Sequence, residues 1–424
     1  MIVVSVLLVG ILGSGCAGAP LVAIGERIVP TAGTALHAGG GASDAMCAEP
    51  AAGSAQSLVD PALVGLDPVA VRAAIDYAVA KGSQSVRVYR HGCLVGVGSN
   101  DPPLETQMLP GWSMTKGVVS MIVGRAVALG ALSVDDPIGR YLPVADERKA
   151  AITVRQLLNQ TSGLRMAWVD DLLDAAGDSV NALLARPFEA VPGTTFDYAQ
   201  TTVTTLGAVT QAAVGEDLQA FAQRELFGPV GIGRGDWDWF RDGAGNTQGF
   251  AFLQMTPDAW GRLGRLLDQD GVWAGKRLLS SEYIAAGRVG TSANPCYGFL
   301  WRNNDGVRCG QTGPLLGVES DTNWMPTVPT DAYGLSGMLD QLVLVIPSLD
   351  MVVVRLGLLP HQVYPDPLGD VAGAQPPITW RFFRLLMSGV TDTRVADPGE
   401  WTPSTMAPVD LVHVFNLPLP EPTW

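Results

Sequence analysis

The sequence predicts an α+β fold in which helices flank a central antiparallel sheet that carries an inserted, mostly helical domain. Strand-like apolar runs occur at 85–98 and at 297–356, and the stretch between them has the patterns of helices. Strands that come from both ends of a chain and enclose a helical block are typical of a sheet that is completed after an insertion. We therefore expect one domain from residues 61–112 and 250–390, and a helical domain over residues 113–249.

The composition is that of a globular protein and argues against several function classes. The chain has 424 residues, 47% of them hydrophobic and 16% charged, with a formal net charge of −14. The acidic balance and the lack of a Lys/Arg cluster argue against a nucleic-acid partner. The sequence has no C-x-x-C, H-E-x-x-H, P-loop or dinucleotide-binding motif, so we expect neither a metal nor a cofactor. It also lacks the G-x-S-x-G motif of α/β-hydrolases.

The N-terminal residues have the pattern of an export signal. Residues 2–12 form a short apolar run, followed by small residues and Cys16. Such a run is too short to span a membrane as a helix but suits a leader. We predict that residues 1–16 are an export signal or a lipoprotein leader with a lipid anchor at Cys16, which would place the protein in the periplasm or at the cell surface. Residues 17–60, rich in Ala, Gly and Pro, would form a tether or an irregular wrap.

The four remaining cysteines suit two disulfides in an oxidising compartment. Cys47, Cys93, Cys296 and Cys309 allow three pairings. We favour Cys296–Cys309 because these two are close in sequence, which leaves Cys47–Cys93. The alternative is four unpaired, buried thiols.

The first predicted elements are a helix and a hairpin. Asp67 and Pro68 begin the helix as a cap and a first-turn proline, and alanines at helical spacing extend it to Gly82. A hairpin over 86–97 turns at His91.

The helical block and a second hairpin follow. The predicted helices cover 117–132, 154–158, 180–184, 201–214, 218–226 and 258–269. The runs 342–346 and 351–356 are nearly continuous and apolar, which indicates central strands covered on both faces. A helix over 380–387 follows, and the Pro-rich residues 391–424 form a tail to which we assign no role.

Ser113 and Lys116 are candidates for a catalytic pair. Residues three apart share one face of a helix, so the hydroxyl and the amine would lie within reach of each other. A serine hydroxyl becomes a good nucleophile when a base takes its proton. A lysine can be that base if burial or nearby cations lower its pKa. Taken alone, the same four residues also fit a capped helix start with a solvated lysine.

Several segments together resemble the serine β-lactamase-like hydrolases: penicillin-binding-protein-type enzymes, class C β-lactamases, and related esterases and amide hydrolases. The matching segments, in order, are 111–116, 132–137, 157–164, 192–200, 255–273, 297–301 and 342–356. The resemblance implies the β-lactamase/penicillin-binding-protein-like fold over 67–357, with Ser113 as nucleophile, Lys116 as its partner and Tyr198 as catalytic tyrosine. A phenol with a depressed pKa beside the lysine ammonium could take the serine proton and return it to the leaving group. The choice between Lys116 and Tyr198 as base stays open, since the pair is expected to titrate as a unit.

The sequence departs from the family pattern at two places. Gln200 stands where the family often has an asparagine. The third motif, often Lys-Thr-Gly or His-x-Gly, is replaced at 337–341 by Gly-Met-Leu-Asp-Gln, which has no cation to bind a substrate carboxylate. The altered third motif argues against β-lactams and D-Ala-D-Ala peptides as substrates, and Gln200 argues against a true β-lactamase.

The residues around the altered third motif are candidates for the substrate and oxyanion region. A backbone N–H near Asp340 or Gln341 would complete an oxyanion hole with the N–H of Ser113, and a change of side chain at Met338 need not remove it. The Asp340 carboxylate would repel an oxyanion unless it is turned away or paired. Trp112, next to the nucleophile, is a candidate to line the cleft.

The sequence therefore predicts an exported serine hydrolase that forms an acyl-enzyme on small esters or amides, with an esterase favoured over a β-lactamase. One alternative is a catalytically idle binding protein. The other is an acyltransferase or peptidase that uses the same site.

Overall fold

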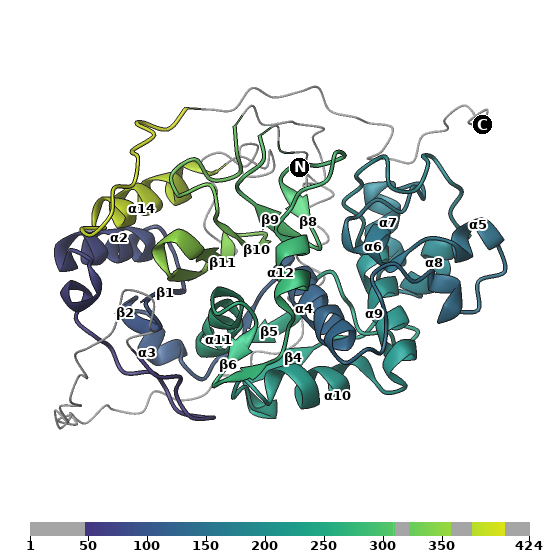
Figure 1. The fold of residues 1–424 in the computed structure, drawn as a ribbon, viewed down its shortest axis with the longest axis horizontal. Helices are drawn as coiled ribbons and strands as arrows, with labels where there is room; N and C mark the ends of the chain where they lie inside the picture. Colours follow the sequence, from purple (N-terminus) through teal and green to yellow (C-terminus); the bar gives the residue numbers. More distant parts are fainter. Residues whose placement is uncertain (1–46, 308, 310–321, 358–374, 403–424) are drawn as a thin grey trace. The chain divides into compact units, whose positions relative to one another are not determined.

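The computed structural model describes residues 47–307, 309, 322–357 and 375–402. Within these residues the centre of the fold is a seven-stranded antiparallel sheet with the order β2-β1-β12-β11-β10-β9-β8 (Figure 1). The strands are β1 (Ser85–Arg90), β2 (Cys93–Val97), β8 (Tyr297–Gly298), β9 (Trp301–Asn303), β10 (Tyr333–Gly337), β11 (Gln341–Ile346) and β12 (Met351–Leu356). The pairing of Ser85 with Leu356 joins the two predicted hairpins into one sheet. The α+β prediction is confirmed.

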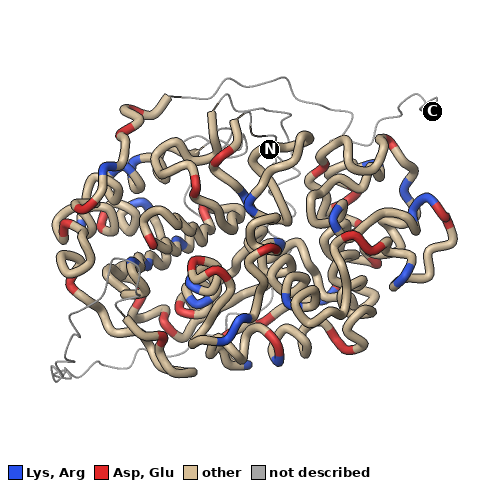
Figure 2. Tube along the Cα trace, in the orientation of Figure 1, with Lys and Arg blue, Asp and Glu red and all other residues tan. Residues whose placement is uncertain are grey.

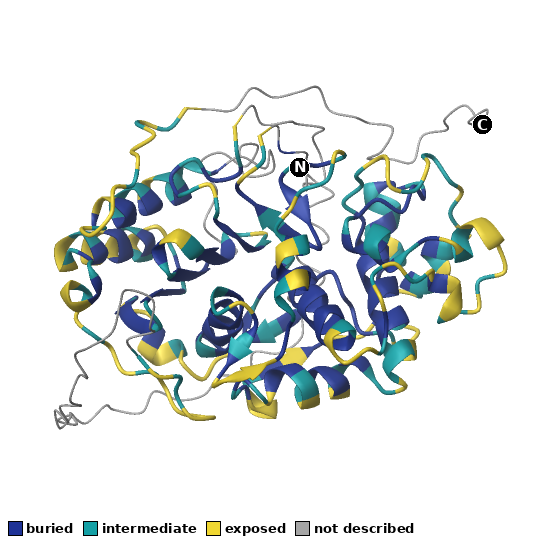
Figure 3. Cartoon of the chain, viewed as in Figure 1, coloured by how far each residue is buried: buried dark blue, intermediate teal, exposed yellow. Residues whose placement is uncertain are grey.

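The two central strands are covered on both faces, as their continuous apolar sequence predicts. Val343 and Val345 belong to the core that includes residues of α4 (Met114–Ala128) and α11 (Pro257–Asp268). Leu342 and Leu344 belong to a second core with residues of α2 (Pro68–Ala80) and α14 (Pro377–Ser388). Because side chains alternate along a strand, one apolar run supplies both layers. Figure 3 shows the strands and α4 as largely buried.

Most of the described helices lie between the two hairpins. Besides α4, this part of the chain contains α5 (Glu147–Ala150), α6 (Val154–Leu158), α7 (Trp168–Asp174), α8 (Ser179–Ala185), α9 (Gln200–Val214) and α10 (Leu218–Ala222). Shorter elements there and elsewhere are η1 (Pro61–Val64), α3 (Asp101–Leu104), η2 (Ile138–Arg140), η4 (Arg234–Asp236), α12 (Ser281–Gly287) and η5 (Pro347–Leu349). The division into a sheet domain and a helical domain stays a prediction.

Three of the predicted helices differ from the observed ones by three residues or more at one end. The helix predicted over 380–387 spans Pro377–Ser388. The helix predicted over 117–132 spans Met114–Ala128, so it begins directly after Ser113 and ends before Gly130, whose φ is +71°. The helix predicted over 218–226 is α10 followed by a π-helical turn, Gln223–Phe227, in which the Gly228 N–H donates to the carbonyl of Gln223. An extra residue in a helical turn leaves no mark on the apolar spacing of so short a segment.

A small sheet absent from the sequence prediction anchors the segment before Ser113. Its order is β3 (Leu109–Pro110), β5 (Leu253–Met255) and β4 (Trp237–Trp239). A further two-stranded ribbon joins β6 (Val272–Trp273) to β7 (Lys276–Arg277). Strands of two or three residues are too short for a period of two to be recognised in the sequence.

Both favoured disulfides are present. Cys47 bonds to Cys93, and Cys296 bonds to Cys309. Such bonds persist in oxidising compartments, so they fit an exported protein.

None of the described helices is long and apolar enough to cross a membrane. Figure 2 shows acidic and basic positions interspersed along the described residues. The predicted leader with Cys16, most of the segment 17–60 and most of the tail 391–424 lie outside the described residues.

Candidate active site

Ser113 lies on a constrained turn at the start of α4. Trp112, immediately before it, has φ +47°, a left-handed conformation that is uncommon for a bulky residue and is often found at functional sites. The N–H of Gly111 donates to the carbonyl of Leu253 at 2.9 Å, which fixes the turn against β5. The Ser113 side chain makes no helix-capping hydrogen bond, so the interpretation as a capped helix start is wrong for this residue.

Lys116 is buried in a pocket of neutral acceptors. Its side chain is 1% exposed, and Nζ lies 3.1 Å from Ser113 Oγ, 2.8 Å from Gln200 Oε1 and 2.9 Å from the carbonyl oxygen of Phe250. Burial lowers the pKa of Lys116 to about 7, and the charge of Asp171 acts in the opposite direction. A lysine can act as the base if burial lowers its pKa, and Lys116 meets this condition.

The partners of Lys116 also orient its lone pair. A neutral amine has two N–H donors and one acceptor position. Gln200 Oε1 and the Phe250 carbonyl can only accept, so they take the two donors. The remaining direction is toward Ser113 Oγ, where the lone pair can accept the hydroxyl proton.

Tyr198 joins the same group of side chains. Its ring centroid lies 4.5 Å from Lys116 Nζ, and its hydroxyl hydrogen-bonds with the Ser113 side chain. Burial raises the pKa of Tyr198, and the Ser113 hydrogen bond and the charge of Arg302 oppose this only in part. The expectation of a depressed phenol pKa is wrong, because the loss of hydration disfavours the phenolate more strongly than these neighbours favour it. Tyr198 is therefore a neutral O–H donor at neutral pH.

Gln200 connects Lys116 to a buried carboxylate that the sequence analysis missed. Its Nε2 donates to the Tyr198 carbonyl at 3.1 Å, and its backbone N–H donates to Asp171. Asp171 is fully buried, accepts the Thr201 N–H at 3.3 Å as well, and pairs with Arg186 at 2.8 Å. A carboxylate at the first turn of α9 satisfies N–H groups that the helix leaves unpaired. No motif marks Asp171, since its role depends on a contact with residues 29 and 30 positions away.

The open half of strand β10 lies against Ser113. A Cβ placed on Gly337 would lie 3.0 Å from the Ser113 nitrogen and 2.4 Å from the Gly111 oxygen, so only glycine allows this approach. On the edge away from β11, strand β9 pairs with Tyr333 and Gly334 and with no later residue of β10.

The backbone direction along β10 shows which of its residues face the open edge. The N–H of Asn304 donates to the carbonyl of Ala332 at 3.0 Å, so Ala332 directs its polar backbone groups to the β9 edge. Every second residue of a strand does the same. By this alternation Ser336, the last such residue of β10, directs its backbone groups to the edge that β9 leaves open. The residue of β10 that contacts the Ser113 backbone is Gly337, the first residue of the expected motif segment.

The remaining predicted residues of this region are placed elsewhere. Met338 is 48% exposed at the turn between β10 and β11. The Asp340 side chain is 5% exposed and forms an ion pair with Arg355 at 2.7 Å, so it is paired rather than directed at Ser113. Gln341 lies in β11 opposite Gly337, and its Oε1 accepts the Gly357 N–H at 3.1 Å.

The structure thus brings Ser113, Lys116, Tyr198 and Gln200 together, with Trp112 adjacent through the backbone. The side chains of Met338, Asp340 and Gln341 form no hydrogen bond with this group. Within the described ranges, no group of three or more His, Cys, Asp or Glu residues could hold a metal ion.

Known proteins with similar sequences or folds include hydrolases. Esterase EstB from Burkholderia gladioli is 27% identical over 214 residues, a stretch that covers 41% of this chain and 53% of EstB. The chain thus spans about half the length of this curated relative. A penicillin-binding protein homologue from Caulobacter crescentus shares the fold with a TM-score of 0.57 at 17% identity, over 79% of this chain and 99% of that one.

A second solved structure is EstCE1, described as a hydrolase with promiscuous acyltransferase activity. Its TM-score is 0.52 at 18% identity, over 75% of this chain and 97% of that one. At these identities the two solved structures establish the fold alone. The family described as Beta-lactamase matches residues 71–357, more than half of the chain. Sequence and fold agree that the chain belongs to the β-lactamase family, whose fold was predicted from its motifs.

Proposed function

We propose that this protein is an exported serine hydrolase that cleaves small esters through an acyl-enzyme on Ser113. One observation carries the proposal. The buried Lys116 amine, with a pKa of about 7, lies 3.1 Å from Ser113 Oγ while two carbonyl acceptors occupy its N–H groups. A base positioned in this way activates a serine hydroxyl.

In the first step, neutral Lys116 takes the Ser113 proton as Oγ attacks the ester carbonyl. The oxyanion that forms would be stabilised by the N–H of Ser113 and by a backbone N–H of the segment at Gly337, which lies against Ser113. Removing one such donor typically costs about 3 kcal/mol of barrier height.

In the second step, the C–O bond to the leaving group breaks. The neutral Tyr198 phenol donates its proton to the leaving alkoxide and regains a proton from the Lys116 ammonium, which restores both residues. Water then enters, Lys116 takes a proton from it, and the hydroxide attacks the acyl carbonyl. The bond between the acyl carbon and Ser113 Oγ breaks, the Lys116 ammonium returns its proton to Oγ, and the acid is released with Ser113 and neutral Lys116 restored. The raised pKa of Tyr198 supports its part as the proton donor.

Esters are favoured over β-lactams by the residues that face Ser113. Leu335, Ser336 and Gly337 provide no cation for a substrate carboxylate, and Gln200 replaces the asparagine common in the family. The curated relative EstB is described as an esterase, which supports the same assignment.

The test is hydrolysis of 4-nitrophenyl acetate by the wild type, Ser113→Ala and, as a control, the exposed Ser292→Ala. We expect Ser113→Ala to lose on the order of 10⁴-fold or more in kcat. The intact mass of the wild type should show one acetyl group on Ser113 during turnover. Activity retained in Ser113→Ala would contradict the proposal, and the Ser292→Ala control should keep full activity.

The pH dependence provides a second test of the base. Only the neutral amine accepts a proton, so kcat/KM should fall as the pH drops through about 7, the pKa of Lys116. A flat profile between pH 5 and pH 9 would rule out Lys116 as the titrating base.

Transfer to an alcohol is a second candidate activity. It is suggested by EstCE1, whose description includes acyltransferase activity and whose fold is shared. Hydrolysis in the presence of a competing alcohol such as methanol distinguishes the two, because a transferase gives the methyl ester in excess of the free acid.

Export is supported by the two disulfides. We expect the mature protein to begin after the apolar run, with or without a lipid on Cys16. Mass spectrometry of the protein recovered from its native cell envelope would identify the mature N-terminus and any attached lipid.

A further inference from the structure

Two bulky aromatic residues next to Ser113 have a left-handed backbone. Strand β3 pairs with β5, and the N–H of Gly111 extends this pairing by donating to the carbonyl of Leu253 at 2.9 Å. The next residues in the same register are Trp112 and Phe252, whose φ values are +47° and +68°. Bulky residues seldom adopt this conformation, and such residues cluster at functional sites. The fold thus places one aromatic residue from each strand beside the turn that carries Ser113.

Phe252 belongs to a row of three rings that leads from Lys116 to the surface. The ring centroid of Phe250 lies 5.5 Å from Lys116 Nζ and 5.5 Å from the ring centroid of Phe252. The ring centroid of Phe252 in turn lies 6.1 Å from that of Phe240. Phe250 is 5% exposed, Phe252 is half-buried and Phe240 is 50% exposed. The outer end of this phenylalanine row therefore presents apolar ring surface to solvent.

A separate aromatic group lies against Lys116 as well. The ring centroid of Tyr198 is 4.5 Å from Lys116 Nζ and 6.1 Å from that of Tyr297. In the proposed reaction Tyr198 protonates the leaving alkoxide, so the leaving group lies toward Tyr198. Because the two substituents of an ester carbonyl point away from each other, the acyl group then extends from Ser113 toward the phenylalanine row.

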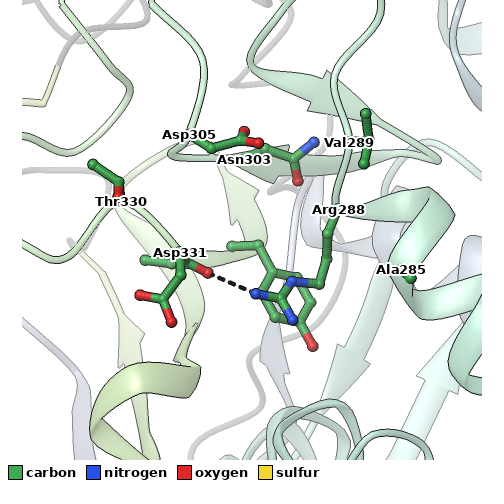
Figure 4. A pocket seen from close by; sticks show the side chains of 9 residues that line it. Ala285, Arg288, Val289, Asn303, Asp305, Thr330 and Asp331 are labelled. Atoms are coloured by element: carbon green, nitrogen blue, oxygen red, sulfur yellow. Dashed lines mark hydrogen bonds between the residues drawn. The ribbon is translucent and has the colours of Figure 1, made fainter.

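The cavity beside α12 is too far away to receive the acyl group (Figure 4). Its volume is about 370 Å³, and its lining includes Tyr333 at the start of β10. Gly337, which lies against Ser113, ends the same strand about 13 Å away, at roughly 3.3 Å per residue. Recognition of the acyl group therefore depends on residues closer to Ser113.

We propose that the phenylalanine row binds the acyl group of the ester, and that the preferred acyl groups are uncharged and carry an aromatic ring. This inference rests on the proposed esterase activity of Ser113. Aromatic rings attract each other edge to face or offset, at centroid distances of about 4.5–7 Å. The three phenylalanines already contact one another in this way, with interplanar angles of 86° and 68°. A phenyl ring placed against Phe252 and Phe240 would extend the row and remove apolar surface from water.

The kinetic test uses three 4-nitrophenyl esters that share the leaving group and differ only on the acyl side: the acetate, the phenylacetate and the cyclohexylacetate. Each kcat/KM is divided by the rate of alkaline hydrolysis of the same ester. For the wild type we expect the phenylacetate to exceed the acetate by about tenfold or more and the cyclohexylacetate by about threefold or more.

Variants of the row should lower this preference. In Phe240→Ala and in Phe252→Gly the ratio of phenylacetate to acetate should fall by about fivefold. Glycine suits the φ of +68° at position 252, so the second change removes the ring without adding backbone strain. Leu129→Ala is the control, since Leu129 is 48% exposed and follows the far end of α4, and it should keep the ratio of the wild type.

A covalent adduct locates the acyl side directly. With phenylmethanesulfonyl fluoride, Ser113 Oγ bonds to the sulfur, fluoride leaves, and the hydroxyl proton passes to Lys116. In a crystal of this adduct of the wild type we expect the phenyl ring against Phe252 and Phe240, at centroid distances of about 4.5–7 Å. A ring that lies against Phe196 or Tyr297 instead would overturn the inference.

The outcomes separate this inference from the proposed function. A wild type that hydrolyses the three esters equally well, or row variants that keep its phenylacetate preference, would overturn the inference and leave the esterase intact. A wild type that hydrolyses none of the esters would overturn the proposed function and this inference with it. Phe240→Ala changes a half-exposed side chain, so it decides the matter even if Phe252→Gly does not fold.

Discussion

Lys116 and Arg355 are both buried cations, but the protein surrounds them in opposite ways. Lys116, on α4, is 1% exposed and contacts neutral oxygens of Ser113, Gln200 and Phe250. Arg355, on β12, is fully buried and pairs with the Asp340 carboxylate at 2.7 Å. A lysine that is buried with no carboxylate in contact has a lowered pKa, which prepares it for proton transfer. An arginine that is buried against a carboxylate keeps its charge, and the ion pair fixes a turn.

Lys116→Arg should have the largest effect on activity, because it keeps the positive charge but removes the ability of the side chain to lose its proton. A guanidinium does not lose its proton at accessible pH and cannot act as a base. We expect kcat for 4-nitrophenyl acetate to fall by about 10³-fold or more, within the range of lost acid–base catalysis. Circular dichroism of the variant should remain that of the wild type. Activity within tenfold of the wild type would mean that Lys116 acts only through its charge.

Asp340→Asn should have the next largest effect, on stability rather than on chemistry. It keeps the size of the side chain but leaves the buried Arg355 charge without its counter-ion, which typically costs about 3–5 kcal/mol. Urea unfolding measures the loss. The double variant Asp340→Asn with Arg355→Met should recover most of it, since the unpaired charge is then gone. No recovery would show that the turn itself, not the ion pair, stabilises this end of the sheet.

Gln200→Glu would convert the surroundings of Lys116 into those of Arg355. A carboxylate in contact with the amine raises the pKa of Lys116 by roughly 1–3 units. The acid limb of kcat/KM should therefore move to higher pH, and activity at pH 7 should fall by about fivefold to several hundredfold. Gln200→Met is the neutral control, in which the limb should not move upward. If the acid limb of kcat/KM does not move in Gln200→Glu, the group that titrates in this limb is not Lys116.

Asp135→Asn should have the smallest effect, because its partner lies at the surface. The Arg155–Asp135 pair has a distance of 2.7 Å, yet the two side chains are 41% and 69% exposed. Exposed ion pairs contribute below about 1 kcal/mol. If Asp135→Asn lowers the free energy of unfolding in urea as much as Asp340→Asn does, burial does not decide how much these ion pairs stabilise the fold.

The sequence predicted what local patterns and family motifs encode. The hairpin over 342–356 and the helix after Asp67 follow from apolar runs and a capping aspartate, and their observed bounds agree closely. The Cys47–Cys93 and Cys296–Cys309 pairs followed from number and spacing.

The remaining features depend on contacts between distant segments. The Asp340–Arg355 pair requires the strand register, and the Asp171 contact at the start of α9 requires the packing of α7. The direction of the Tyr198 pKa shift requires the degree of burial, which a motif does not state. The same holds for the contact of Gly337 with the Ser113 backbone, which depends on how β10 packs against the start of α4.

The pairing of Ser85 with Leu356 has a consequence for how the chain is synthesised. Until β11 and β12 leave the ribosome, β1 has no inner neighbour and presents an unpaired strand edge. Sheets closed by such distant segments fold slowly, and their intermediates are prone to aggregate. A chain that stops before Met351 would carry Ser113, Lys116 and Tyr198 intact but would lack β12, which pairs with both β1 and β11, and we expect it to be recovered as insoluble material.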